Sequence, residues 1–123
     1  MSGADELEQA VAYDREGLEA EAIPHYERAI SAGLGDEQLA KALLGLGSSL
    51  RNVGRLDESV RVLEGAVGRF PEHRALPVFL AFSLWSGGRR GEAMALLARR
   101  LGDGSGYERA IGEYADDIER SEG

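Results

Sequence analysis

Side chains that could carry out chemistry are few in this 123-residue sequence, and they are not grouped in the patterns that catalysis or metal binding requires. His25 and His73 are the two histidines, and neither has a cysteine or histidine partner at metal-site spacing, so both are expected at the surface. Asp116 and Asp117 belong to an acidic segment, for which a solubilising face is the better interpretation. The chain has no cysteine, which excludes a thiol nucleophile, a thiolate metal site and a disulfide framework.

Two glycine-rich segments, residues 87–91 and 102–106, are similar in composition to phosphate-binding loops. Neither follows an expected strand or ends in the Gly-Lys-Ser/Thr sequence of such loops, so both are expected to be turns. No serine, histidine and aspartate can be placed together as a triad from the sequence. The sequence therefore predicts a protein that is not an enzyme, with no catalytic residue, no metal ligand and no cofactor site.

The charge of the chain is uneven along its length, although the net charge is −8. Residues 1–39 carry ten acidic and two basic side chains, residues 40–102 carry five acidic and ten basic ones, and residues 103–123 carry seven acidic and two basic ones. The net charge argues against nucleic-acid binding, which requires a positive surface. One explanation of the basic charge of residues 40–102 is that it belongs to solvated helix faces of neighbouring units. The alternative is that these residues take part in head-to-tail self-association or bind an acidic segment of a partner.

Membrane and export signals are missing from the sequence. No apolar run approaches the roughly 20 residues that a membrane span needs. Residues 1–9 are acidic and lack the basic and apolar regions of a signal peptide. A cytoplasmic protein without a membrane partner is therefore expected.

The elements that must position any binding residues are helices, and residues 40–73 give the clearest pattern. Apolar and small residues follow helical spacing on two successive segments, at Leu43, Gly47 and Leu50, and at Ser59, Leu63 and Ala66. Gly54 separates the segments and Pro71 ends the second, which predicts a helical hairpin.

The same pattern occurs three times along the chain. Adding 34 to Leu50 and Gly54 gives Leu84 and Gly88, and subtracting 37 gives Tyr13 and Gly17. The sequence therefore predicts three hairpins within one domain, at about residues 3–36, 40–73 and 74–106.

This spacing resembles the tetratricopeptide repeat family, whose 34-residue consensus has small and aromatic residues in the first helix, then Gly, then A-x3-[FY]-x2-A, then Pro. The matching residues are Ala10, Tyr13, Gly17, Ala22, Tyr26 and Ala29; Gly47, Leu50, Gly54, Ser59, Leu63, Ala66 and Pro71; and Ala81, Leu84, Gly88, Ala93 and Leu97. No tryptophan opens any repeat, and Arg100 replaces the consensus alanine. The resemblance implies a right-handed superhelix of helix pairs that binds other proteins.

An all-α domain of seven helices is expected. The helices are predicted at about residues 3–16, 18–32, 36–52, 56–69, 74–86, 90–101 and 106–120, with a late start or a bend caused by Pro24 in the second. The last helix carries an apolar stripe at Tyr107, Ile111, Tyr114 and Ile118. It is predicted to cover the end of the array, and the alternative is that it docks on another copy to form a homodimer.

A row of positions on the first helix of each hairpin is predicted to line the inner curve of the array. Its proposed peptide-binding residues are Leu7, Val11, Lys41, Leu44, Ser48, Arg51, Val78, Phe82 and Trp85. Phe82 and Trp85 would be the aromatic anchors. The competing interpretation places these side chains in the core, and it is favoured for Leu7 and Leu44 and for Trp85, which lies near the end of the array.

Taken together, these patterns predict a non-catalytic adaptor that binds a short peptide or a helix in its concave groove. Lys41 and Arg51, the latter expected to be exposed, would favour an acidic or carboxyl-bearing partner. Some tetratricopeptide repeat domains clamp the acidic carboxyl tail of chaperones with polar side chains on the inner positions of the first helix. This sequence has Leu7 and Val11 at those positions, so binding of such a carboxyl tail is not expected. The alternative is a self-association module that uses the last helix or its charge-complementary faces.

Overall fold

The computed structural model describes residues 1–122, and all regular structure in this part of the chain is helical. Seven helices follow one another, namely α1 (Gly3–Arg15), α2 (Glu19–Ala32), α3 (Asp36–Asn52), α4 (Leu56–Arg69), α5 (Leu76–Ser86), α6 (Arg90–Gly102) and α7 (Glu108–Glu122). The predicted fold class and the number of helices are confirmed.

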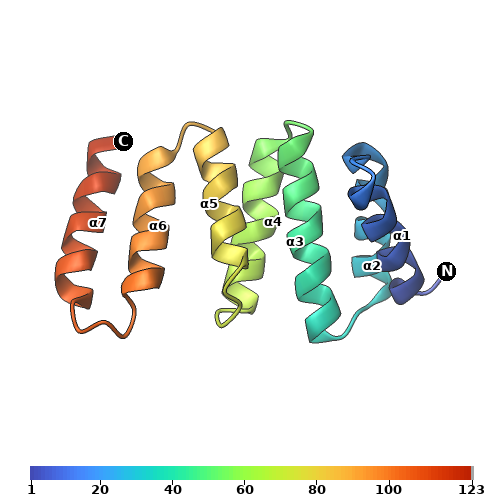
Figure 1. Cartoon of the computed structure of the whole chain (residues 1–123), viewed down its shortest axis with the longest axis horizontal. Coiled ribbons are helices and arrows are strands. Elements are labelled where there is room, and N and C mark those ends of the chain that lie inside the picture. Colours follow the sequence, from blue (N-terminus) through green and yellow to red (C-terminus); the bar gives the residue numbers. More distant parts are fainter. Residues whose placement is uncertain (123) are drawn as a thin grey trace.

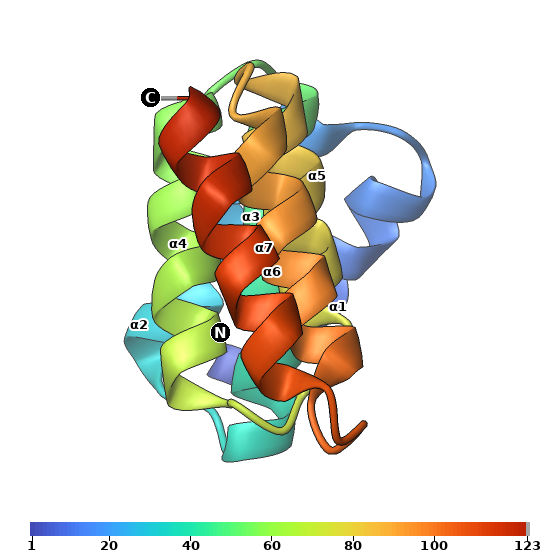
Figure 2. The same ribbon diagram turned by 90° about the vertical axis from the view of Figure 1, so that its left-hand side faces the viewer.

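The helices stand side by side in a linear array that begins with α1 and α2 and ends with α7 (Figure 1). Viewed from the α7 end, their axes run roughly alongside one another (Figure 2). Within residues 1–122, α1 contacts α3 and α3 contacts α5, whereas α2, α4 and α6 do not contact one another. The first helices of the hairpins therefore form one continuous face.

Each hairpin turns through a glycine in the left-handed region of backbone space, with φ of 76° at Gly17, 86° at Gly54 and 81° at Gly88. A side chain at these positions would be strained, which is why the sequence has glycine there. The same backbone hydrogen bond closes the turn in all three hairpins. It joins Arg55 N to Leu50 O at 2.9 Å in the second hairpin and Arg89 N to Leu84 O at 2.8 Å in the third. The shared geometry shows that the hairpins are in register.

Two glycines of α3 allow the neighbouring helices to approach closely. A Cβ atom on Gly45 would overlap the ring of Tyr26 on α2, and one on Gly47 would overlap the side chain of Leu63 on α4. Tyr26 and Leu63 are both buried, and each belongs to one of the two hydrophobic clusters that form the core. The small residues of α3 therefore set the spacing on both of its sides.

Three local expectations need correction. Of the two alternatives expected from Pro24, the late start of α2 is wrong, since the helix begins at Glu19 and contains Pro24. Pro24 is exposed, so the carbonyl that its ring leaves without a partner can reach water. Helix α5 begins at Leu76, after position 74, so Pro77 lies in its first turn, where the amide that proline lacks would have no partner within the helix. His73 lies just before this start, and its Nδ1 accepts a hydrogen bond from the Leu76 amide at 3.3 Å. His73 is therefore half-buried, contrary to the expected surface position.

Helix α7 packs on α6 and on no other helix. Gly91 and Gly102 of α6 leave room for Ile118 and Ile111, since a Cβ at either glycine would crowd these side chains. Arg99 of α6 pairs with Asp116, at 2.6 Å, and with Glu119. The contact between α6 and α7 thus has a glycine near each end of α6 and ion pairs on one flank.

Candidate binding surface

The predicted contact row is divided by the structure into parts with different surroundings. Leu7 is 5 % exposed and belongs to the core of the first hairpin, so it is not available to a ligand. Val11, Lys41 and Leu44 line a hollow of about 300 Å³ between α1 and α3. Ser48 and Val78 are half-buried and line none of the hollows described here.

Arg51 connects α3 to α5 and is not a free surface arginine as expected. Its Nε donates to the hydroxyl of Ser86 at 2.9 Å and to the carbonyl oxygen of Phe82 at 3.3 Å. The guanidinium also lies over the Phe82 ring, 5.8 Å from its centre. These contacts hold the positive charge at the edge of the face formed by the first helices.

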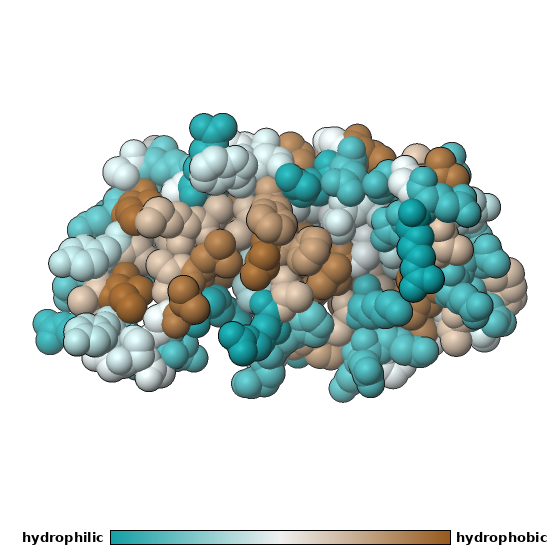
Figure 3. Space-filling view, in the orientation of Figure 1, coloured by the Kyte–Doolittle hydropathy of each residue, from teal (hydrophilic) through white to brown (hydrophobic). Residues whose placement is uncertain are grey.

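Phe82 and Trp85 are exposed on this face, so the interpretation that neighbouring elements cover Trp85 is wrong. They line one side of an apolar groove of about 540 Å³ between α5 and α6. The residues of the groove are Ala81, Phe82, Trp85, Ala93, Met94, Leu97, Ala98 and Leu101. Hydrophobic atoms gather over this half of the molecule, whereas the end formed by α1 and α2 is largely hydrophilic (Figure 3).

A comparison of equivalent positions in the three hairpins explains why the groove is open. In the first hairpin Ile23 and Tyr26 are 3 % and 2 % exposed, because α3 covers them. In the second hairpin the equivalent Val60 and Leu63 are 6 % and 0 % exposed, because α5 covers them.

In the third hairpin the equivalent residues have no covering helix. Met94 is 60 % exposed and Leu97 is 36 % exposed. Helix α7 contacts α6 but does not contact α5, so it does not occupy the place that α3 and α5 take in the earlier repeats. The groove is therefore the vacant position of a fourth first helix.

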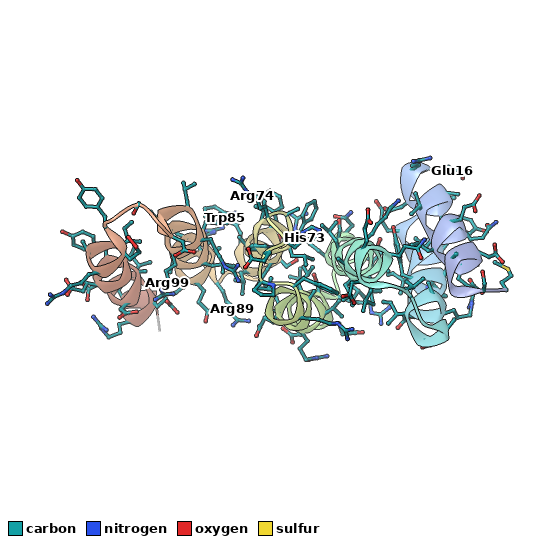
Figure 4. All side chains as sticks on the ribbon, turned by 90° about the horizontal axis from the view of Figure 1, so that it is seen from below. Glu16, His73, Arg74, Trp85, Arg89 and Arg99 are labelled. Atoms are coloured by element: carbon teal, nitrogen blue, oxygen red, sulfur yellow. The ribbon has the colours of Figure 1, made fainter. Side chains whose placement is uncertain are left out.

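The position of α7 leaves part of its apolar stripe exposed. Trp85 and Arg99 point to opposite sides of the α5–α6 layer (Figure 4), so the ion pairs of Arg99 are on the side away from the groove. At 3.6 residues per turn, Tyr114 and Glu119 lie on opposite sides of the stripe formed by Ile111 and Ile118, and Tyr107 immediately precedes α7. Both tyrosines are exposed, whereas the stripe was expected to cover the end of the array. They extend the apolar surface beyond the groove.

Sequence reasoning missed the contribution of α6 to this surface. Met94, Leu97 and Leu101 recur at helical spacing, which is a signal for an apolar face. In the repeat pattern, however, Leu97 is the equivalent of Leu63, which is buried. The signal was present, but whether the face is covered depends on where α7 docks.

The charged groups nearest the groove are arginines. The Arg90 guanidinium lies over the Trp85 ring, 4.8 Å from its centre, and Arg51 lies over Phe82. Neither arginine forms an ion pair within residues 1–122. Both exposed aromatic rings therefore lie beside a guanidinium group at the α5–α6 turn whose charge is not neutralised by a carboxylate within residues 1–122.

The other polar cluster of the molecule is structural. Glu6 on α1 accepts from His25 Nδ1 at 2.7 Å and from Arg28 Nε at 3.1 Å, both on α2, and the His25 ring stacks on Tyr13. The hydrogen bond from His25 and then the Arg28 charge hold the pKa of Glu6 below its ordinary value. His25 is thus half-buried and links two helices, contrary to the expected surface position.

Tyr26 makes a second polar contact between the same helices. Its hydroxyl donates to Asp14 Oδ2 at 2.6 Å, and burial together with this carboxylate raises the pKa of the phenol. No three His, Asp or Glu side chains in residues 1–122 are grouped to hold a metal ion. In the same range none of the helices combines the length and apolar character of a membrane span.

Comparison with known proteins agrees with the geometry of the array. The family model described as Tetratrico peptide repeat matches residues 3–118. Searches of curated proteins and of solved structures gave no significant match. Three in-register hairpins, their glycine turns and the extent of the family match lead to one assignment: the chain belongs to the tetratricopeptide repeat family.

Proposed function

We propose that this protein binds a short peptide or a helix of a partner protein on the face formed by its first helices, with the groove between α5 and α6 as the main contact. Tetratricopeptide repeat proteins are generally non-catalytic scaffolds for protein–protein interaction, which supports a binding role. The observation that carries the proposal is the exposure of Phe82 and Trp85 beside Met94 and Leu101 in one apolar groove. Contiguous apolar surface of this kind marks interaction sites in soluble proteins.

The positive charges of two arginines and Lys41 indicate that the proposed partner segment is acidic. Arg51 and Arg90 lie beside the groove, and Lys41 lines the hollow between α1 and α3 on the same face. A segment that combines apolar anchors with carboxylates would use both features. Trp85 is the sole tryptophan of the chain, and aromatic anchors of this type dominate binding energy. The small groove fits an affinity of about micromolar strength.

The test is capture of partner proteins by the full chain and by two variants. Trp85→Ala combined with Leu101→Glu removes an anchor and places a charge in the groove, whereas Leu18→Glu changes an exposed apolar residue outside it. Proteins bound through the groove are retained by the native chain and by Leu18→Glu but lost with the double variant. Circular dichroism must show that both variants keep their helices. Retention of the same proteins by the folded double variant refutes the proposal.

A second copy of the chain is the other candidate occupant. Tyr107 and Tyr114 extend the exposed apolar surface onto α7, which favours a larger flat contact of the kind found between subunits. Light scattering over a range of protein concentrations separates the two candidates. A monomer at all concentrations excludes self-association, and a dimer that Leu101→Glu converts to monomer establishes it.

A further inference from the structure

The partner segment that fits the groove is an α-helix with a particular charge pattern. We infer that the groove accepts an amphipathic helix of a partner protein, parallel to α5, with apolar residues on one face and a carboxylate near its C-terminal end. This inference rests on the proposed function and adds the conformation, direction and charge of the ligand.

The conformation follows from the comparison of the three hairpins. Met94 and Leu97 are equivalent to Val60 and Leu63, which α5 covers, and to Ile23 and Tyr26, which α3 covers. In both cases the covering element is a helix that packs against the two helices of the preceding hairpin. The surface left open by α5 and α6 has therefore the shape that this array fills with a helix.

The direction follows from the order of the first helices. Helices α1, α3 and α5 all run the same way along the face (Figure 1). A helix that continues the stack is parallel to α5 and antiparallel to α6, so its C-terminal end lies next to the turn between Ser86 and Arg90. This turn is where Arg90 stacks on Trp85 and Arg51 stacks on Phe82.

The charge follows from this placement. The C-terminal end of a helix carries a partial negative charge from its carbonyl groups, and a carboxylate there adds a full one. Arg51 and Arg90 form no ion pair within residues 1–122 that a ligand would have to replace. A carboxylate at the other end of the helix would lie away from both arginines.

Two alternative helices of the chain itself are less suitable. The outer face of α1 is polar, with Glu8 and Gln9 exposed, so the N-terminal end of a second copy would bring charged groups against an apolar floor. Helix α7 is held on α6 by Arg99 and by the packing of Ile111 and Ile118. A helix from another protein remains the occupant that satisfies the groove.

The probe is a synthetic helical peptide with leucines at i, i+4, i+7 and i+11, alanines between them and two glutamates in the last turn. Three matched peptides serve as controls. In one the glutamates are moved to the first turn, and in another they are replaced by lysines. In the third the glutamates stay in the last turn, and two central alanines are replaced by prolines. Glutamates in the first turn favour the free helix, so intrinsic helicity acts against the expected preference. Titrations follow the emission of Trp85, which is 55 % exposed and shifts to shorter wavelength when a ligand covers it.

We expect the peptide with glutamates in its last turn, the first peptide, to bind at micromolar concentration. Each of the three matched peptides is expected to bind at least tenfold more weakly. Leu101→Glu is expected to weaken the first peptide at least tenfold, while Leu18→Glu leaves its affinity unchanged. Equal affinity of the proline peptide would mean that an extended segment binds, which overturns the inference and leaves the proposed function intact. Equal or tighter binding of the first-turn or lysine peptide overturns the assigned direction and charge.

Two further outcomes overturn the proposed function as well. The first is the absence of binding by all four peptides at millimolar concentration, or binding that Leu101→Glu does not change. The second is a dimer in light scattering whose Trp85 emission is already shifted to shorter wavelength and returns to the exposed value in Leu101→Glu. That result assigns the groove to a second copy of the chain.

Discussion

The hydroxyl groups of Ser59 on α4 and Ser83 on α5 lie 2.7 Å apart in the interior, and neither side chain is accessible to solvent. Ser59 also donates to the carbonyl oxygen of Gly47 on α3 at 2.7 Å. The hydroxyl of Ser59 therefore donates to α3 and accepts from Ser83, so the pair joins the second hairpin to the third. A buried polar link of this kind stabilises the interface only while both partners are present.

Replacing one member of this pair is expected to destabilise the protein. Ser59→Ala removes the partner of the buried Ser83 hydroxyl and the second hydrogen bond to the Gly47 carbonyl, and the free energy of unfolding falls by about 1–3 kcal/mol. Ser49 gives the matched control, since its buried hydroxyl has no hydrogen-bond partner. Ser49→Ala is expected to leave the free energy of unfolding unchanged or to raise it. Urea unfolding followed by circular dichroism measures both, and an equal loss in the two variants would contradict the bonding pattern.

Glycine-to-alanine substitutions are expected to have opposite effects on neighbouring helices. In Gly45→Ala the new methyl group overlaps the ring of Tyr26, which lowers the free energy of unfolding by about 1–3 kcal/mol. In Gly65→Ala, on the exposed side of α4, the methyl group meets no other atom. Alanine favours the helix there, so stability rises by about 0.5–1 kcal/mol. Thermal unfolding of the two variants side by side tests the signs.

The third hairpin is expected to tolerate the loss of a leucine that the second hairpin requires. Leu63→Ala empties a fully buried site and lowers the free energy of unfolding by about 2–5 kcal/mol. Leu97→Ala, at the equivalent position of α6, is expected to lower it by about 1 kcal/mol or less, because Leu97 is already partly in water. Chemical unfolding of both variants gives the comparison. Similar losses would show that Leu97 is covered in solution.

The link between Glu6 and α2 is expected to weaken in acid. Because the pKa of Glu6 is held below its ordinary value of 4.5, its contribution to stability is complete above that value and is lost as the pH falls through the lowered pKa. Glu6→Gln removes this titration. The difference in melting temperature between the native chain and Glu6→Gln should therefore shrink between about pH 7 and about pH 3. A difference that stays constant with pH would assign it to packing and not to charge.

The array was predictable from the sequence because its signals are local. Gly54 and Gly88 are at the turns where the backbone needs them, Pro71 follows the end of α4, and the buried residues recur at helical spacing. Ser2 and Asp5 also form a capping box, in which Asp5 N donates to Ser2 Oγ at 3.1 Å and Ser2 N donates to Asp5 Oδ2 at 3.3 Å. Such features depend on residues a few positions apart.

The apolar groove between α5 and α6 was predicted only in part because its exposure depends on packing between distant parts of the chain. Phe82 is exposed on α5, whereas Leu7 of the same predicted row is covered by the first hairpin. The exposure of Trp85 and Leu101 is decided by α7, which docks at the glycines of α6 and stands away from α5. An apolar stripe in the sequence predicts which side of a helix is buried. It does not predict which other helix packs against that side.

Helix α7 is joined to the molecule through α6 alone, whereas α3 is held by α1, α2, α4 and α5. Each interface of a linear array contributes separately to stability, so α7 can open while the three hairpins stay folded. Amide hydrogens of α7 would then exchange with solvent sooner than those of α3. A probe on α7 would then report its opening before the ring of Tyr26 reports the unfolding of the hairpins.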